Sequence, residues 1–243
     1  DEDEEDEYAD EDSLDGEEVD FVMARHVLEH LPEPMMLIQA IRGGIARGGG
    51  VYLEVPNFSW TVRRSAIEDL LYEHCGYYTP ETLAHLVRRA GLRDVRAEAR
   101  FDGLFATVDG RVADDPGSDD PIDGAVVDEL RSGIGALLGR IEALQAELDV
   151  CRASGRRLVL WGGGGRAVGL LNLVPRAEAV ERVVDVNPRK QGTFIPGTGH
   201  EIVAPELLRR DPPDTVLIVN PVYRDEIEGM LSALGVDADL ITI

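Results

Sequence analysis

The alternation of short apolar runs with amphipathic stretches predicts an α/β protein. The apolar runs typical of buried strands fall into two groups, and the second group follows a long polar and helical stretch. They are 20–25, 51–57 and 95–108 in the first group, and 158–161, 183–185, 215–220 and 239–242 in the second. The run 95–108 divides into two strands at Asp102-Gly103. The strand, helix and strand of residues 20–57 form a unit that implies parallel pairing of its two strands.

Helical patterns separate these runs. The first places Ile38, Ile41 and Ile45 on one apolar face and breaks at Gly48-Gly49-Gly50. A second begins with Thr79 as its N-cap and ends at Gly91. A long third helix ends near Cys151, and its apolar positions repeat at intervals of four and three residues: Leu137, Ile141, Leu144 and Leu148. The spacing is heptad-like, and we expect a helix that packs on its own domain rather than a coiled-coil dimer.

Composition then sets the domain boundaries. The expected organisation is a disordered acidic arm, a first α/β domain, a linker with the long helix, and a second α/β domain. These are residues 1–19, 20–112, 113–155 and 156–243. The linker is the polar, proline- and glycine-containing stretch 114–121.

The charge is strongly negative. The net charge is −23, 14 acidic residues lie within the first 20 positions, and Lys190 is the single lysine. Nucleic-acid binding is therefore not expected, because phosphate contacts require a basic face. Excess surface carboxylate suggests a salt-adapted cytoplasm, because salt screens the self-repulsion.

Other features place the chain in the cytoplasm. No apolar run reaches the length of about 20 residues that a membrane-spanning helix requires, so no membrane partner is expected. Two cysteines, Cys75 and Cys151, form no spacing pattern and indicate a reducing compartment. No zinc motif is present, so no metal site is predicted.

Candidate catalytic groups occur in two short segments. His26 and His30 lie just past the end of the strand 20–25, where ligands bind in parallel sheets. Glu73-His74 lies in the segment 58–78, which connects the strand 51–57 to the helix that begins at Thr79. An imidazole can take a weakly acidic proton next to a carbonyl group, and a neighbouring carboxylate can orient the ring. A second imidazole or a phenol, His30 with Tyr72 or Tyr77, could donate to the developing enolate oxygen. The alternative for Glu73 and His74 is that they cap the following helix.

The second domain carries a glycine-rich loop. Residues 162–167 fit G-x-G-x-x-A between a strand and a helix, and Asp185 ends the next strand at the spacing expected for a ribose contact. Gly162, Gly164 and Gly165 would allow the backbone to approach phosphates. The alternative is a tight turn with only a structural role.

The segments 20–34 and 51–57 resemble the central part of class I S-adenosylmethionine (SAM) dependent methyltransferases. The Glu73-His74 segment, Thr79-Pro80-Glu81 and Ala90-Gly91-Leu92 are similar to the sugar C-methyltransferases, which act on nucleotide-linked deoxysugars. The resemblance implies that His74 is the general base, that Glu73 supports it and that His30 lies near the reacting centre. The family usually has a tyrosine two positions before this glutamate. In this chain that position is Leu71, and Tyr72 is adjacent to Glu73. The resemblance also places Arg25 and His26 at the SAM cofactor.

The second domain resembles the C-terminal domain of the same family. The segments that carry this resemblance are 185–192, 195–199 and 220–226. They imply a substrate cleft in which Asp185, Asn187, Lys190, Asn220 and Tyr223 contact a nucleotide-sugar.

The fold class expected is therefore α/β: a partial class I methyltransferase (Rossmann-like) sheet followed by a second small Rossmann-like domain. No SAM-binding glycine loop precedes residue 20 and the family's zinc module is missing, so we expect a truncated or inactive methyltransferase domain. Its sheet would have an exposed edge that invites a homodimer or a partner chain. The function expected is SAM-dependent C-methylation of a nucleotide-sugar or related carbonyl compound. The alternatives are a non-catalytic nucleotide-sugar binding module and an NAD(P)-binding protein.

Overall fold

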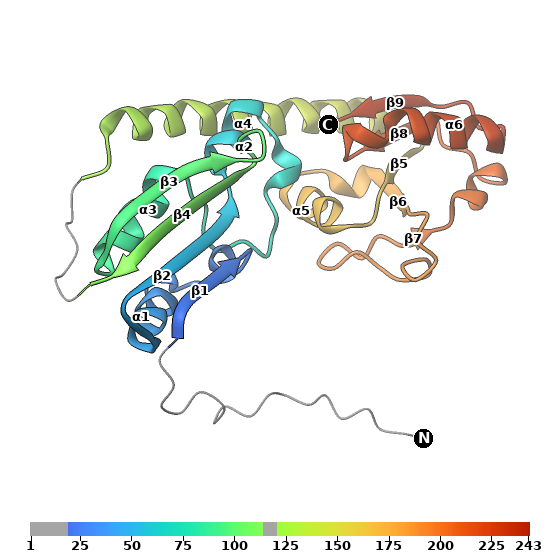
Figure 1. Cartoon of the computed structure of the whole chain (residues 1–243). Helices are drawn as coiled ribbons and strands as arrows, with labels where there is room; N and C mark the ends of the chain where they lie inside the picture. Colours follow the sequence, from blue (N-terminus) through green and yellow to red (C-terminus); the bar gives the residue numbers. More distant parts are fainter. Residues whose placement is uncertain (1–18, 114–120) are drawn as a thin grey trace, which may run out of the picture.

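The computed structural model describes residues 19–113 and 121–243. The first part contains a four-stranded sheet of order β1-β2-β4-β3, and the second contains a five-stranded sheet of order β7-β6-β5-β8-β9 (Figure 1). The expected α/β class is confirmed. The predicted disordered arm and most of the predicted linker lie outside the described residues.

The first sheet joins a parallel pair to an antiparallel pair. Strand β1 (Val19–Arg25) runs parallel to β2 (Ile45–Pro56), as the strand, helix and strand unit predicts. Strand β4 (Phe105–Val112) pairs antiparallel with both β2 and β3 (Leu92–Arg100). The two strands expected around Asp102-Gly103 are therefore confirmed.

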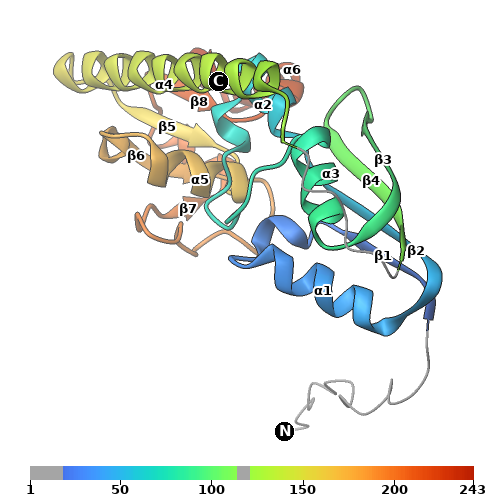
Figure 2. The same ribbon diagram turned by 90° about the vertical axis from the view of Figure 1, so that its left-hand side faces the viewer.

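One face of this sheet is covered by two helices, α1 (Pro34–Gly44) and α3 (Pro80–Arg89) (Figure 2). Ile38 of α1 and Leu83 and Val87 of α3 are buried in the same hydrophobic cluster as residues of β2 and β4. Helix α3 begins with a capping box in which Thr79 and Thr82 exchange side-chain and backbone hydrogen bonds. Because Thr79 caps this helix, the alternative that Glu73 and His74 cap it is wrong.

The prediction that the first helix continues to a break at Gly48-Gly49-Gly50 is wrong. The structure ends α1 at Gly44, and β2 includes Ile45 and all three glycines. Gly50 pairs with Phe21 of β1 and Arg111 of β4, and a Cβ on Gly50 would lie 2.6 Å from the Phe21 ring. A larger residue at position 50 would require the exposed Phe21 ring to move. A pattern of residue types cannot distinguish such a close approach from a break.

Strand β1 forms the outer edge of the described sheet. Phe21 is 55% exposed and Met23 is 60% exposed. Phe21 and Met23 are alternate residues, so their side chains point to the same face of the strand. The partial sheet with an exposed edge stays a prediction. The homodimer stays a prediction.

The second sheet is parallel throughout, as predicted. Its strands are β5 (Leu158–Trp161), β6 (Val180–Val184), β7 (Ile202–Val203), β8 (Thr215–Ile218) and β9 (Asp239–Thr242). Helices α5 (Gly165–Leu173) and α4 (Gly124–Ala153) pack on one face. Helix α6 (Arg224–Leu234) and the 3-10 helix η5 (Pro205–Arg209) pack on the other. The remaining 3-10 helices here are η4 (Ala177–Ala179) and η6 (Pro221–Tyr223).

The long helix α4 extends past both sheets (Figure 1). Its predicted apolar seam is buried: Leu137, Leu144 and Leu148 are each at most 3% exposed and pack in the core of the second domain. The seam therefore serves intramolecular packing, as expected. The same core includes Val62 of α2 (Phe58–Arg64) and Ile67 of the 3-10 helix η3 (Ile67–Asp69), which precede α3 in the chain.

Candidate functional site

The first polar cluster lies at the carboxyl ends of β1 and β2. The Glu54 carboxylate is 2% exposed and accepts hydrogen bonds from Arg25 Nε at 2.8 Å and the Tyr52 hydroxyl at 2.9 Å. Burial by itself would raise the pKa of Glu54, but the hydrogen bonds from Tyr52 and Arg25 hold the pKa below its usual value. Of the residues expected at the cofactor, Arg25 thus pairs with Glu54, and His26 Nε2 lies 3.5 Å from the same carboxylate.

The second cluster brings together the two histidine segments that the sequence singled out. Backbone hydrogen bonds join the segment 73–76 to the 3-10 helix η2 (Leu28–His30). Cys75 N and Gly76 N both donate to the Glu29 carbonyl, at 2.7 and 3.0 Å. The rings of His30 and His74 then meet edge to face with centroids 4.9 Å apart. The juxtaposition expected of His30 and His74 therefore exists in the structure.

Glu29 is the member of this cluster that sequence reasoning missed. The residue is 1% exposed, and neither carboxylate oxygen has a hydrogen-bond partner among the described residues. His26 Nδ1 lies 3.3 Å from Glu29 Oε1. The signal was the His-x-x-Glu-His spacing of residues 26–30, in which the glutamate lies between the two histidines.

The environment of His74 favours its neutral form. Burial lowers the pKa of His74, the negative charge of Glu29 opposes this shift, and the nearby His30 adds to it. Glu29 raises this pKa more than Glu73 does. The Glu73 side chain is exposed, and its backbone carbonyl lies 3.2 Å from His30 Nδ1.

The tyrosines of this segment differ in their placement. Tyr72 is 61% exposed, whereas the Tyr77 ring packs 5.0 Å from Phe58 and 6.2 Å from the His74 ring. Burial raises the pKa of Tyr77, so its hydroxyl stays protonated and can donate. Tyr77 is therefore the tyrosine that the structure brings to the histidines.

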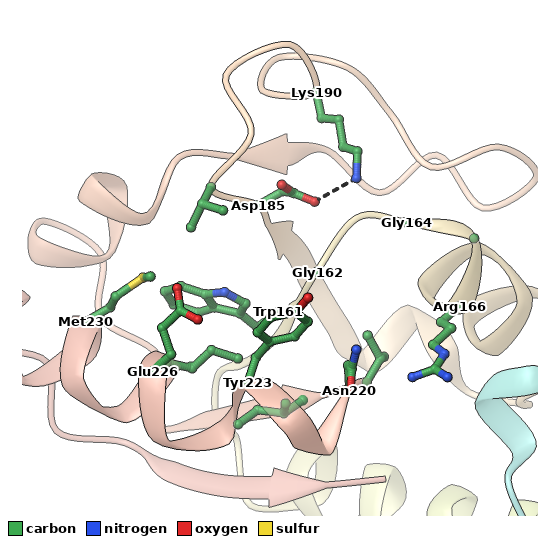
Figure 3. A pocket seen from close by; sticks show the side chains of 15 residues that line it. Trp161, Gly162, Gly164, Arg166, Asp185, Lys190, Asn220, Tyr223, Glu226 and Met230 are labelled. Carbon is green, nitrogen blue, oxygen red and sulfur yellow. Dashed lines mark hydrogen bonds and ion pairs between the residues drawn. The ribbon is translucent and has the colours of Figure 1, made fainter. Parts of the chain in front are cut away.

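A pocket of about 420 Å³ lies in the second domain, at the carboxyl ends of β5, β6 and β8 (Figure 3). The order in which the strands follow one another across the sheet reverses between β5 and β8, which is where ligands bind in sheets of this kind. Buried Trp161 and half-buried Met230 form apolar walls, and the polar groups include Asn220, Tyr223 and Glu226. Gly162, Gly164, Gly165, Asp185, Lys190, Asn220 and Tyr223, all expected at a nucleotide-sugar, line this pocket.

The Asp185 carboxylate is already engaged within the protein. It accepts Gly163 N at 2.7 Å, Asn187 N at 2.8 Å and Lys190 Nζ at 3.1 Å. Burial opposes ionisation, but these donors hold the pKa of Asp185 below its usual value. Three donors occupy most of the acceptor positions of a carboxylate, so Asp185 ties the glycine loop to the segment 187–190. Asn187 donates through its backbone N–H and does not line the pocket.

The pocket and the histidine cluster are connected through the segment 69–71. Arg166 lines the pocket (Figure 3). It pairs with Asp69 at 2.8 Å. A Cβ on Gly165 would lie 3.7 Å from the Leu71 side chain. His74 follows three residues later and donates its backbone N–H to the Leu71 carbonyl at 3.1 Å.

Family comparisons match the two parts of the chain separately. Residues 1–97 match a methyltransferase domain, and residues 140–238 match the C-methyltransferase C-terminal domain. These matches support a SAM-dependent methyltransferase, and the methyltransferase domain implies SAM as the cofactor. No curated protein matches the sequence.

Solved structures with similar segments share low identity with this chain. A Thermotoga maritima SAM-dependent methyltransferase is 14% identical, with a TM-score of 0.32 over 38% of this chain and 56% of its own. An Archaeoglobus fulgidus SAM-dependent methyltransferase is 18% identical, with a TM-score of 0.32 over 39% of this chain and 59% of its own. The Thermus thermophilus 16S rRNA methyltransferase RsmC is 15% identical, with a TM-score of 0.27 over 92% of this chain and 50% of its own. The chain thus spans about half the length of these proteins.

The residues that the resemblance places at SAM lie at the carboxyl ends of β1 and β2. Arg25 and His26 each contact the Glu54 carboxylate there, at 2.8 and 3.5 Å. Within residues 19–113, no glycine-rich strand-to-helix loop is present to hold the methionine part of SAM; the loop of that kind follows β5 in the second sheet. The described residues do not by themselves fit the whole cofactor.

None of the helices in the described ranges combines the length and apolar character that crossing a bilayer requires.

Proposed function

We propose that this chain takes part in SAM-dependent methylation of a carbon next to a carbonyl group in a nucleotide-linked sugar. The observation that carries the proposal is the placement of the His30–His74 pair beside the segment 69–71, which contacts the pocket-lining helix α5. The matched C-methyltransferase C-terminal domain supports carbon as the methylated atom.

In this proposal each group has a chemical role. His74 accepts the proton from the carbon to be methylated. Tyr77, or His30 when both of its ring nitrogens are protonated, donates to the enolate oxygen that develops. The pocket between β5 and β8 holds the nucleotide, with Trp161 as an apolar wall and Tyr223 and Asn220 as polar contacts. The chemistry of methyl donation belongs to SAM, and this chain's residues position the acceptor and move its proton.

The test of catalysis is the transfer of a labelled methyl group from SAM to a nucleotide-linked keto sugar, followed by mass spectrometry of the product. The variant His74→Ala should lower the turnover number by about 10²–10⁴ while leaving nucleotide-sugar affinity unchanged. Replacement of His85, a histidine on α3 outside the cluster, by Ala should have no such effect. Unchanged turnover in His74→Ala would remove His74 from the mechanism.

The test of binding is calorimetric titration of a thymidine or uridine diphosphate sugar. Replacing Tyr223, which lines the pocket, by Ala should weaken binding by about tenfold, as expected when a base loses an aromatic contact. Replacing Phe101, which lies in the turn between β3 and β4, by Ala is the control. Equal affinities of both variants and the unaltered chain would reject the pocket as the nucleotide site.

A second candidate function is a non-catalytic nucleotide-sugar binding module. It is favoured by the incomplete SAM site within the described residues. Calorimetric titration of SAM distinguishes the two: nucleotide-sugar binding without SAM binding or methyl transfer supports the module. The NAD(P)-binding alternative is weakened by the engagement of Asp185 with three internal donors, and titration with NADH tests it.

A further inference from the structure

Glu29 has a buried carboxylate that the proposed acid–base chemistry does not use. The residue is 1% exposed, yet neither carboxylate oxygen has a hydrogen-bond partner among the described residues. Buried carboxylates are normally paired, hydrogen-bonded or bound to a metal. A protonated His26 at 3.3 Å could pair with Oε1, but this leaves Oε2 without a partner.

Two imidazoles lie close enough to share a ligand with this carboxylate. One ligand atom from each of Glu29, His30 and His74 lies within 4.8 Å of the other two. The three residues come from η2 and from the segment that hydrogen-bonds to it through Cys75 N and Gly76 N, so the backbone holds them together. A metal ion can draw such atoms inward to the bond lengths of about 2.0–2.2 Å that zinc requires.

The tautomer of His30 fits a ligand. His30 Nδ1 lies 3.2 Å from the Glu73 carbonyl oxygen, which can only accept, so Nδ1 carries the hydrogen. Nε2 is then left with a lone pair. A backbone carbonyl that receives the second ring N–H is the arrangement that orients histidine ligands of metal ions.

We infer that Glu29, His30 and His74 form a binding site for a transition-metal ion of the Zn²⁺ or Co²⁺ type. Two imidazole nitrogens and one carboxylate oxygen suit these ions better than Mg²⁺ or Ca²⁺, which prefer oxygen ligands. Three protein ligands leave a further coordination position for water or a small ligand.

The site has a consequence for methyl transfer, and this part rests on the proposed function. A His74 lone pair bound to a metal ion cannot accept a proton. Metal binding and the general-base role therefore exclude each other, so the ion inhibits the reaction and a chelator restores it.

The experiment is a titration of Co²⁺ into the full chain, followed by its visible absorption, with Zn²⁺ as the displacing ion. Excess Mg²⁺ in the buffer fills sites made of carboxylates alone, which matters for a chain with a net charge of −23. We expect one Co²⁺ per chain, with the strong absorption of four- or five-coordinate cobalt, and displacement by Zn²⁺.

Conservative variants assign the ligands. Glu29→Gln keeps the side-chain shape and removes the charge, and His74→Gln removes an imidazole; each should weaken Co²⁺ binding by at least about tenfold. The control His85→Gln changes a histidine outside the cluster and should bind as the unaltered chain does. Circular dichroism of the same samples verifies that each variant is folded.

Two results would overturn the site. The first is that the chain does not bind Co²⁺ at micromolar concentrations of the metal. The second is that the Glu29→Gln variant binds Co²⁺ as tightly as the unaltered chain does. Neither result affects the proposed methyl transfer, which is measured separately. Metal binding without loss of methyl transfer would overturn the inferred inhibition.

Discussion

Three buried glutamates have different electrostatic environments. Glu54 is held ionised by Arg25 and Tyr52, whereas Glu29 has no hydrogen-bond partner among the described residues. Glu68, in η3, is 8% exposed, and burial raises its pKa. A hydrogen bond from its own backbone and the charges of Arg166 and Arg140 offset this only in part. Burial raises the pKa of both Glu54 and Glu68, and the partners of each carboxylate decide whether its pKa lies below or above the usual value.

Glu68→Gln should stabilise the protein near neutral pH. The folded-state pKa of Glu68 is raised, so its ionised form is penalised by folding once the pH exceeds the ordinary glutamate pKa of about 4.3. Urea unfolding at pH 7 should show a gain in the free energy of unfolding above the scatter of about 0.5 kcal/mol for surface changes. The gain should vanish as the pH falls below about 4, where the carboxyl is neutral in both states.

The control for this prediction is Glu142→Gln on the exposed side of α4. It should change the free energy of unfolding by less than about 0.5 kcal/mol. A loss of stability in Glu68→Gln at pH 7 would contradict the prediction, because it would mean that the ionised carboxylate stabilises the fold.

At the scale of elements, helix α5 lies against the segment that leads to His74. Gly169 of α5 is buried, and a Cβ there would lie 2.7 Å from the Leu70 carbonyl oxygen and 3.5 Å from the Leu71 Cα. The close approach fixes the distance between the second domain and the segment 69–71. The position of the histidine cluster relative to the pocket therefore depends on this glycine.

Gly169→Ala should lower the free energy of unfolding by about 1–3 kcal/mol, because the backbone of Leu70 must shift to relieve the contact. Gly229→Ala is the matched control: Gly229 is an exposed residue within α6, and a Cβ added there would meet nothing within 4 Å. That change should raise the free energy of unfolding by about 0.5–1 kcal/mol through helix propensity. Urea unfolding measures both, and equal gains would show that α5 does not contact the segment closely.

At the scale of the whole molecule, a hydrophobic core shared by the two parts of the chain stabilises the fold, and the net charge opposes it. Val62 and Ile67 from the first part of the chain pack with Leu144 of α4 and Leu160 of β5 in one hydrophobic cluster. The net charge of −23 opposes this compact arrangement through self-repulsion. Salt should therefore affect the stability of the molecule as a unit.

The thermal unfolding midpoint at pH 7 should rise as KCl increases from about 0.1 M to about 1 M, because the screening length falls from about 10 Å to about 3 Å. Scanning calorimetry at several salt concentrations measures the effect. The control uses the same protein near its pI of about 4.5, where the net charge is small and the effect of salt should shrink. A midpoint independent of salt at pH 7 would contradict the hypothesis of salt adaptation.

The pattern of residues was enough to predict the α/β class, the parallel pairing of β1 and β2, the antiparallel pair β3 and β4 and the parallel second sheet. Strand and helix periodicity and the right-handed connection of parallel strands are local rules, so they can be read from sequence. The position just after a strand selected His30, whereas the resemblance to the sugar C-methyltransferases selected His74.

Only the tertiary structure decided the contacts across long sequence separations. Val62 and Ile67 lie in the core of the second domain, and the three glycines at 48–50 lie within β2. Glu29 is buried beside the histidines. The Asp185 carboxylate accepts hydrogen bonds from three internal donors. Burial and hydrogen-bond partners depend on which segments meet in space, and residue types alone do not specify those meetings.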